Sequence, residues 1–336
     1  MEAGHRKRIM TKPATKPAWK SAALRWGGSV LVLALLFWML RAHLGEMLAT
    51  IRRVPPAAWV FVLIGYMGVH FIGVSKWRLM VNLAGAELSW PVAARCYFAG
   101  LFANMFLPSL VGGDVVRAGM GMTAGRNRAG VLLGSFFDRM LDVVALATVA
   151  GFGALMLPRA LDEQSRKVFW GVAVLLVLGA AGAPLAWRVF SKRLPFKFRR
   201  KLVKVRQAAR SMRRRPQYVA LSFTFSVTMQ AGFVSLMASL SYLGGLAIPV
   251  HLWYFAYPLA KLSAMLPVTQ GGLGVREAAL AALLVPFGAP MQKTVAVGLL
   301  WETIVYAGGL LAGALALLFG RAHARKDSTE LATIVH

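Results

Sequence analysis

Long runs of apolar residues dominate the chain, and short polar segments separate them. Six runs are long enough to cross the roughly 30 Å hydrocarbon core of a bilayer as helices, at about 1.5 Å per residue. They lie at residues 22–40, 57–75, 131–157, 168–187, 218–243 and 294–319. Tryptophans such as Trp59 and Trp77 fall near the predicted ends, where a membrane interface favours them. The pattern predicts an all-α integral membrane protein with about six full spans.

Two further apolar segments, 92–125 and 250–290, are interrupted by proline and glycine. Broken backbone at membrane depth is tolerated where it is buried in protein or lines a wet cavity. We therefore expect two broken, re-entrant helical segments. The alternative, that each is a pair of short tilted spans, stays open at this point.

Basic residues outnumber acidic ones by 39 to 12, and they cluster between the apolar runs. Such clusters mark the cytoplasmic side of membrane proteins. We expect a basic cytoplasmic tail at 1–20, a polytopic membrane domain at 21–320 with a cytoplasmic basic loop at 188–217, and a cytoplasmic tail at 321–336. Both termini are then cytoplasmic. Arg52 and Arg53, on a predicted outside loop, do not fit this scheme.

Within the basic loop, apolar residues recur at a 4-3-4-3 spacing among lysines and arginines: Phe198, Leu202, Val205, Ala209 and Met212. This spacing predicts an amphipathic helix at 197–213 that lies on an anionic leaflet surface. We expect no nucleic-acid partner, because membrane orientation accounts for the basic residues. The loop could instead recruit an enzyme of a lipid pathway.

Residues typical of catalytic or metal sites are scarce. Cys96 is the single cysteine, and the six histidines show no ligand spacing. There is no H-E-x-x-H or D-x-D motif and no arrangement of a nucleophile with its base. We therefore expect no metal, no cofactor and no catalytic residues, and an intramembrane lipid-modifying enzyme is the less favoured interpretation.

A repeated motif is the most informative feature. Residues 107–117 and 266–276 both read L-P-x-x-x-G-G-x-x-x-R. Proline ends a helix, and the glycine pair permits close approach of a ligand to the backbone. A helix that restarts after the glycines points free N–H groups at the break. An odd number of predicted spans separates the copies, so we expect inverted repeats, a pattern that marks transporter binding sites.

The motif predicts an anion-binding site. Arg117 and Arg276, one helical turn after the glycines, can each present a planar fork to a phosphate or carboxylate. The predicted site also contains the glycine pairs of the two motifs, which are Gly112, Gly113, Gly271 and Gly272.

Several further charges lie at membrane depth: Asp114, Asp138, Arg139, Asp142, Lys261, Glu277 and Glu302. Charges at that depth face the bundle interior and usually pair with one another. They either pair internally or bind the substrate, couple protons or gate transport, and the sequence leaves both interpretations open. Lys261 could instead extend to an interface.

Some of these residues carry a family resemblance. The stretches at 98–104, 107–117, 135–139 and 267–277 resemble the flippase-like transmembrane domain of lysylphosphatidylglycerol synthases, over about residues 90–320. The resemblance implies lipid flipping across the bacterial cytoplasmic membrane, and it adds Asn104 to the predicted headgroup-binding set. Bifunctional members carry a soluble aminoacyl-transferase domain after the membrane part. Sixteen residues follow Gly320 here, so we expect no lysyl transfer.

The sequence thus favours a flippase that moves a phosphate-bearing glycolipid or phospholipid across the bacterial cytoplasmic membrane. The main alternative is a non-transporting partner of a lipid or glycolipid biosynthesis enzyme. The pattern specifies neither the lipid nor the energy source.

Overall fold

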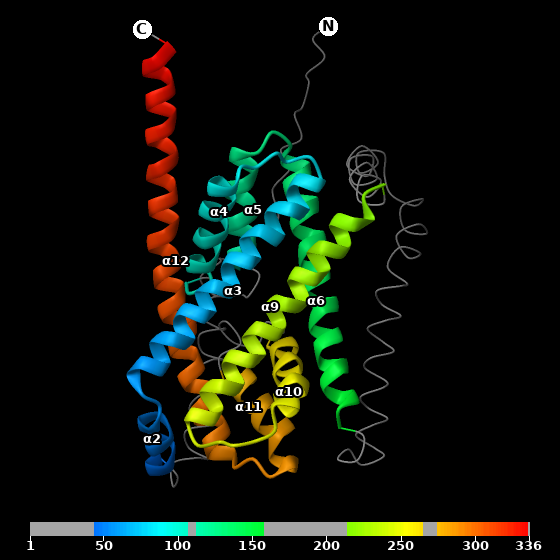
Figure 1. Cartoon of the computed structure of the whole chain (residues 1–336), viewed down its shortest axis with the longest axis vertical. Coiled ribbons are helices and arrows are strands. Elements are labelled where there is room, and N and C mark those ends of the chain that lie inside the picture. Colours follow the sequence, from blue (N-terminus) through cyan, green and yellow to red (C-terminus); the bar gives the residue numbers. More distant parts are fainter. Residues whose placement is uncertain (1–43, 107–111, 158–213, 265–273, 335–336) are drawn as a thin grey trace, which may run out of the picture.

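All regular structure is helical in the residues that the computed structural model describes, which are 44–106, 112–157, 214–264 and 274–334 (Figure 1). This confirms the all-α prediction. The elements are α2 (Leu44–Arg53), α3 (Pro56–Leu83), α4 (Trp90–Ala103), α5 (Gly112–Ala124), α6 (Arg128–Leu155), α9 (Pro216–Leu243), α10 (Val250–Ser263), α11 (Val275–Leu284), the short 3-10 helix η3 (Val285–Phe287) and α12 (Met291–Ile334). Side chains are described as far as Arg321.

Four of the predicted spans fall on the long helices α3, α6, α9 and α12. Of these, α3, α9 and α12 as far as Arg321 are both long and apolar enough to cross a membrane. Helix α6 is as long as α3, at 28 residues, but it carries three of the predicted buried charges. The predicted spans at 22–40 and 168–187 and the amphipathic helix at 197–213 lie outside the described residues, as does nearly all of the basic loop.

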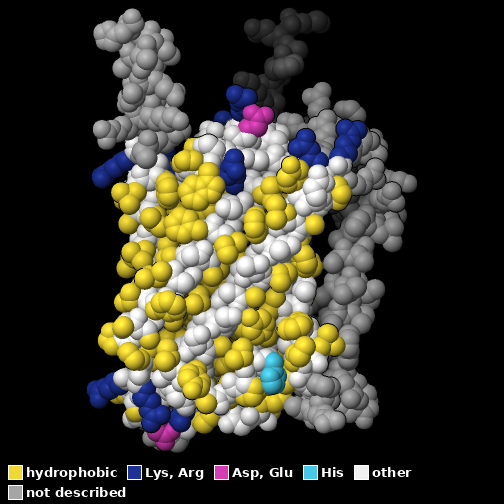
Figure 2. All heavy atoms as spheres, viewed as in Figure 1, with side chains coloured by type: hydrophobic (Ala, Val, Ile, Leu, Met, Phe, Trp, Pro, Cys, Tyr) yellow, Lys and Arg dark blue, Asp and Glu magenta, His cyan; other side chains and the backbone are white. Residues whose placement is uncertain are grey.

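On the face that Figure 2 shows, apolar side chains lie between two ends that carry lysine and arginine. Phe61, Ile64 and Leu317 are each at least 65% exposed. Exposed apolar side chains on long helices are what a lipid solvent requires.

In each predicted broken segment the structure describes two separate helices. Helix α4 ends at Ala103 and α5 begins at Gly112, while α10 ends at Ser263 and α11 begins at Val275. Figure 1 shows α4 and α5 at one end of the bundle and α10 and α11 at the other. The two hairpins therefore enter the bundle from opposite ends, as inverted repeats require.

The repeat extends upstream of the motif. Helices α3 and α9 are both 28 residues long, both begin at a proline, and their bounds are 160 residues apart. Both are followed by a glycine with positive φ, Gly85 and Gly245. The next residue's N–H then bonds a carbonyl five residues back at 3.0 Å, from Ala86 to Val81 and from Leu246 to Ser241. Glycine adopts this left-handed cap without strain.

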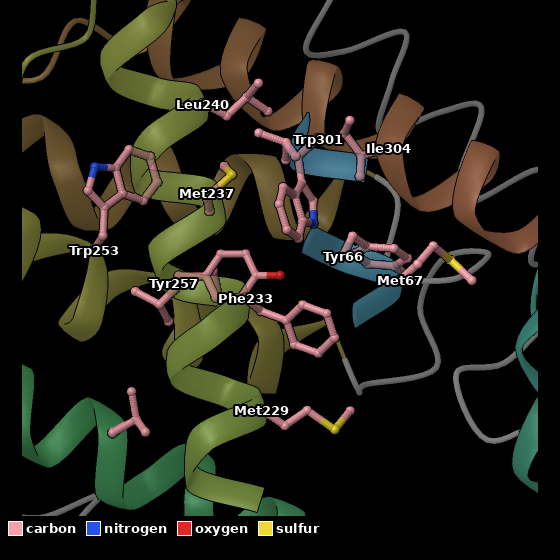
Figure 3. Close-up of a cluster of buried hydrophobic side chains, with 14 of the residues drawn as sticks. Tyr66, Met67, Met229, Phe233, Met237, Leu240, Trp253, Tyr257, Trp301 and Ile304 are labelled. Atoms are coloured by element: carbon pink, nitrogen blue, oxygen red, sulfur yellow. The ribbon is translucent and has the colours of Figure 1, made fainter. Parts of the chain in front are cut away.

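Large aromatic side chains fill the middle of the bundle. Figure 3 shows Tyr66, Phe233, Tyr257 and Trp301 converging from α3, α9, α10 and α12. Their ring centroids lie 5.4 to 6.5 Å apart in the pairs that touch, a spacing typical of edge-to-face packing.

The interfacial position expected for Trp77 is wrong. Its side chain is fully buried, and α3 continues to Leu83, beyond the predicted span end at residue 75. The indole Nε1 donates to Ser135 Oγ on α6 at 2.9 Å. Trp59, by contrast, is partly exposed and donates to Thr303 Oγ1 at 2.8 Å.

Candidate functional site

A cavity of about 230 Å³ lies between the two hairpins, and every described helix from α3 to α12 except η3 contributes to its wall. Its charged lining residues are Lys76, Asp114, Arg117, Arg139, Asp142, Lys261, Arg276 and Glu302. The cavity therefore brings both motif arginines to one place. Asn104 and Gly113 also line it.

The remaining predicted site residues have other positions. Asp138 and Glu277 are fully buried behind the wall, where they contact lining residues. Gly112 begins α5 and is not among the residues that line the cavity. Gly271 and Gly272 lie outside the described residues.

The first hairpin is closed by a glycine contact and a side-chain cap. A Cβ on Gly100 would lie 2.6 Å from the carbonyl oxygen of Gly113, so α4 and α5 touch through their backbones. Asn104 Oδ1 accepts the Gly113 N–H at 2.8 Å. Asn104 thus caps α5, and the Gly113 amide that the motif offers to an anion is already bonded within the protein.

A side chain also caps the short helix of the second hairpin. Gly274 has a φ of 82° and precedes α11, and its N–H donates to Glu277 Oε2 at 2.7 Å. Asp114 occupies the first turn of α5, as Glu277 does in α11. Each short helix therefore holds one of the protein's own carboxylates at its positive end. An incoming anion meets side-chain donors before it meets backbone amides.

Arg117 is held between two aromatic rings and two acids. Its guanidinium carbon lies 5.2 Å from the ring centroids of both Trp77 and Tyr97. One terminal nitrogen, Nη2, is 2.9 Å from Asp114 and 3.4 Å from Asp138. The orientation of the guanidinium is therefore fixed by stacking as well as by charge.

Arg276 has an equivalent arrangement in the second half. Its Nη2 lies 3.0 Å from Glu277 and also pairs with Glu302 on α12. In both halves the motif arginine pairs with an acid in the first turn of its own helix and with an acid on the next long helix. The arrangement of one arginine with two acids is thus the same in both halves, although the acids are aspartates in the first half and glutamates in the second.

Lys76 is the main residue that the sequence pattern missed. It is 1% exposed and pairs with both Asp138, at 3.1 Å, and Asp142. Arg139 lies 3.3 Å from Asp114. In the first half, three cations therefore face three carboxylates. These six charged side chains therefore contact one another, as the internal-pairing interpretation predicts. A role for them in gating stays a prediction.

Lys261 faces the cavity and does not extend to an interface. Its Nζ donates to Gln230 Oε1 at 3.0 Å and lies 4.7 Å from the centroid of Phe233. His70 borders the same ring, with centroids 5.2 Å apart, and its Nδ1 is 3.2 Å from the Tyr97 hydroxyl.

Polar side-chain atoms without a hydrogen-bond partner are concentrated at this cavity. Among the described residues they include Nε of Arg117, Nε of Arg276 and Nε2 of His70, all buried. A buried donor without a partner costs about 1–3 kcal/mol. The same set also contains two carboxylate oxygens, Asp114 Oδ2 and Asp138 Oδ1. The Nε–H groups of the two arginines are the unpartnered donors that a ligand with acceptor oxygens would satisfy. No group of three or more His, Cys, Asp or Glu in the described part of the chain is placed to hold a metal ion.

The repeat offered a signal for some of the missed residues. His70 and Gln230, and likewise Tyr97 and Tyr257, are 160 residues apart and occupy matched positions in the two halves. All four line the cavity. No such signal exists for Lys76, whose counterpart in the second half is the apolar residue Leu236.

Comparison with known proteins agrees with the membrane architecture. Among curated proteins, none matches this chain significantly. The family described as the lysylphosphatidylglycerol synthase TM region matches residues 25–313, which is most of the chain. With its long apolar helices, the chain is an integral membrane protein, and it belongs to the lysylphosphatidylglycerol synthase transmembrane-region family.

Proposed function

We propose that the protein is a lipid translocase that moves a phosphate-bearing glycolipid or phospholipid across the bacterial cytoplasmic membrane. One observation supports this more than any other. Two copies of one motif, in hairpins from opposite ends of the bundle, place Arg117 and Arg276 on the same cavity. Each arginine keeps a buried Nε without a partner.

The physical argument concerns the lipid headgroup. A headgroup that crosses the bilayer must lose its water. An unpaired charge at membrane depth raises the free energy by several kcal/mol. A cavity with buried, fixed N–H donors replaces part of that hydration. Placement between inverted halves lets each half open the site to one side in turn.

The distribution of exposed arginines supports an orientation. The end of the bundle where α4, α6 and α9 begin (Figure 1) carries the exposed residues Arg95, Arg126, Arg128, Arg214 and Arg215, which lie in or near the first turns of those helices. The exposed Arg321 follows Gly320, which faces the Arg95 side chain. The opposite end carries the exposed Arg52 and Arg53. We place the more basic end in the cytoplasm. The α4–α5 hairpin then enters from the cytoplasm and the α10–α11 hairpin from outside.

The test is a dithionite-quench assay on proteoliposomes with fluorescent phospholipid and polyprenyl-phosphate probes, with and without an ion gradient. Arg117→Lys and Arg276→Lys are the informative variants, because they keep the charge that Asp138 and Glu302 require but remove the planar fork. Arg126→Lys, at an exposed position, is the matched control. We expect each of the first two to slow scrambling of one probe at least tenfold.

Two outcomes would count against the proposal. Wild-type rates in both arginine variants would contradict the assignment of the site. No scrambling by the wild-type protein, in either condition, would favour the non-transporting partner of a lipid-pathway enzyme. Deletion of 197–213 tests that second role, since the proposed translocase should still transport without it.

A further inference from the structure

Five cations line the cavity, and they differ in how they are neutralised. Lys76, Arg117, Arg139 and Arg276 each lie within ion-pair distance of at least one carboxylate. Lys261 has no carboxylate partner within that distance among the described residues; an amide oxygen and an aromatic face stabilise it instead.

Those two contacts leave the ammonium group available to a ligand. An ammonium has three N–H donors, and Gln230 accepts one of them. The Phe233 face attracts the charge but accepts no strong hydrogen bond. A ligand oxygen that carries negative charge would form a better contact than either. The paired arginines, by contrast, would have to share their charge with acids that they already contact.

The surrounding donors favour the same kind of ligand. His70 is 6% exposed and its Nε2 has no partner, while its Nδ1 contacts the Tyr97 hydroxyl. When Tyr97 donates to Nδ1, Nε2 carries the hydrogen and is a buried donor without a partner. Lys261 and His70 both border the ring of Phe233. Two donors from the two halves of the repeat thus meet around one aromatic ring.

We propose that Lys261 forms the ion pair with the anionic group of the ligand, with His70 donating a hydrogen bond to it across Phe233. The proposal rests on the proposed function and deepens it. The arginine of each motif then contributes an Nε–H to the bound group while its terminal nitrogens keep their own acids. The chemistry recognised is that of a phosphate, whether on a lipid headgroup or free.

Native mass spectrometry of the purified protein tests this without requiring transport. The probes are phosphatidylglycerol, glucosylceramide of matched acyl chains, and inorganic phosphate. We expect the wild type to bind the anionic lipid at least tenfold more tightly than the neutral one. Lys261→Met, of similar length but uncharged, should reduce that preference to less than threefold, whereas Lys261→Arg should retain most of it.

Two controls separate a binding role from a structural one. Gln230→Met removes the same hydrogen bond between α9 and α10 but leaves the ammonium group, so its preference for the anionic lipid should stay above fivefold. Arg126→Gln removes an exposed charge and tests for non-specific attraction of anionic lipid to the basic end. Thermal unfolding in detergent verifies that every variant is folded.

A folded Lys261→Met protein with the wild-type preference would overturn the proposal, and so would equal losses in Lys261→Met and Gln230→Met. Loss of preference in Lys261→Met, together with unchanged transport in the two arginine variants, would support Lys261 and contradict the arginine site. Binding of inorganic phosphate but of neither lipid, abolished by Lys261→Met, would support Lys261 and contradict the lipid translocase.

Discussion

Lys76 on α3 and Asp138 on α6 form an ion pair of 3.1 Å between side chains that are 1% and 0% exposed. The same ammonium group pairs with Asp142, one turn further along α6. Asp142 also accepts a hydrogen bond from Ser226 on α9 at 3.0 Å. Lys76 thus links α3 to α6, and Asp142 extends the contact to α9.

Replacement of Lys76 by methionine should destabilise the protein strongly. The change leaves two buried carboxylates without their shared cation, and removal of one partner of a buried pair costs about 3–5 kcal/mol. We expect a clear fall in the midpoint of thermal unfolding, measured in detergent by intrinsic fluorescence.

The exposed pair of Arg126 with Glu87 provides the control for Lys76. Its side chains are 83% and 60% exposed, and such surface pairs contribute about 0–1 kcal/mol. Arg126→Met should therefore move the midpoint little. Equal effects of the two substitutions would mean that the α3–α6 charge contact is not formed in the membrane protein.

The glycine contact that closes the first hairpin gives a second prediction. A Cβ on Gly113 would collide with the Gly100 carbonyl and with the Asn104 side chain. Gly113→Ala should force α5 away from α4 and cost about 1–3 kcal/mol, as overpacking does. Because Arg117 lies on α5, lipid binding should weaken as well. Thermal unfolding and the lipid titration measure the two effects.

Gly119 is the matched control, because it lies on the same helix and a Cβ there meets nothing within 4 Å. Alanine is the better helix former by about 0.8–1 kcal/mol. Gly119→Ala should leave stability unchanged or raise it. If Gly119→Ala destabilised the protein as much as Gly113→Ala, α5 would be sensitive to any substitution. That result would contradict a specific role for the backbone contact between α4 and α5.

The two motif arginines could be assigned to one site from sequence alone, because a repeat puts like chemistry at matched positions of two halves. Lys76 could not. A hydropathy pattern treats a lysine as the end of a span, and here it placed that end at residue 75, whereas α3 continues for two more turns. The helix tolerates the charge because α6 supplies two carboxylates.

Asn104 illustrates a different limit. Its place in the family resemblance marks it as a site residue, but the resemblance does not distinguish contact with a ligand from support of the loop. The structure shows its carbonyl oxygen bonded to the Gly113 amide. Which helices are adjacent, and which donors are already used, depends on tertiary packing that no pattern along the chain records.

The pair of Arg276 and Glu302 should show strong coupling. Arg276→Met leaves Glu302 and Glu277 near each other without a cation, so we expect a large loss of stability. Addition of Glu302→Gln removes one of the two charges and should restore part of the loss. Contacting charges couple by about 0.5–3 kcal/mol, which a double-mutant cycle of unfolding midpoints would detect. Strict additivity would contradict the contact.

The proposed orientation predicts which residues react with a membrane-impermeant maleimide in spheroplasts. Arg126→Cys, at the more basic end, should be labelled only after permeabilisation, whereas Arg52→Cys on α2 should be labelled in intact spheroplasts. The native Cys96 is 2% exposed, so it should give little background. The opposite labelling pattern would show that the orientation is reversed and that the α4–α5 hairpin enters the membrane from outside. The cavity and its charges would be unaffected, because they depend on the packing of the helices and not on the side that each hairpin faces.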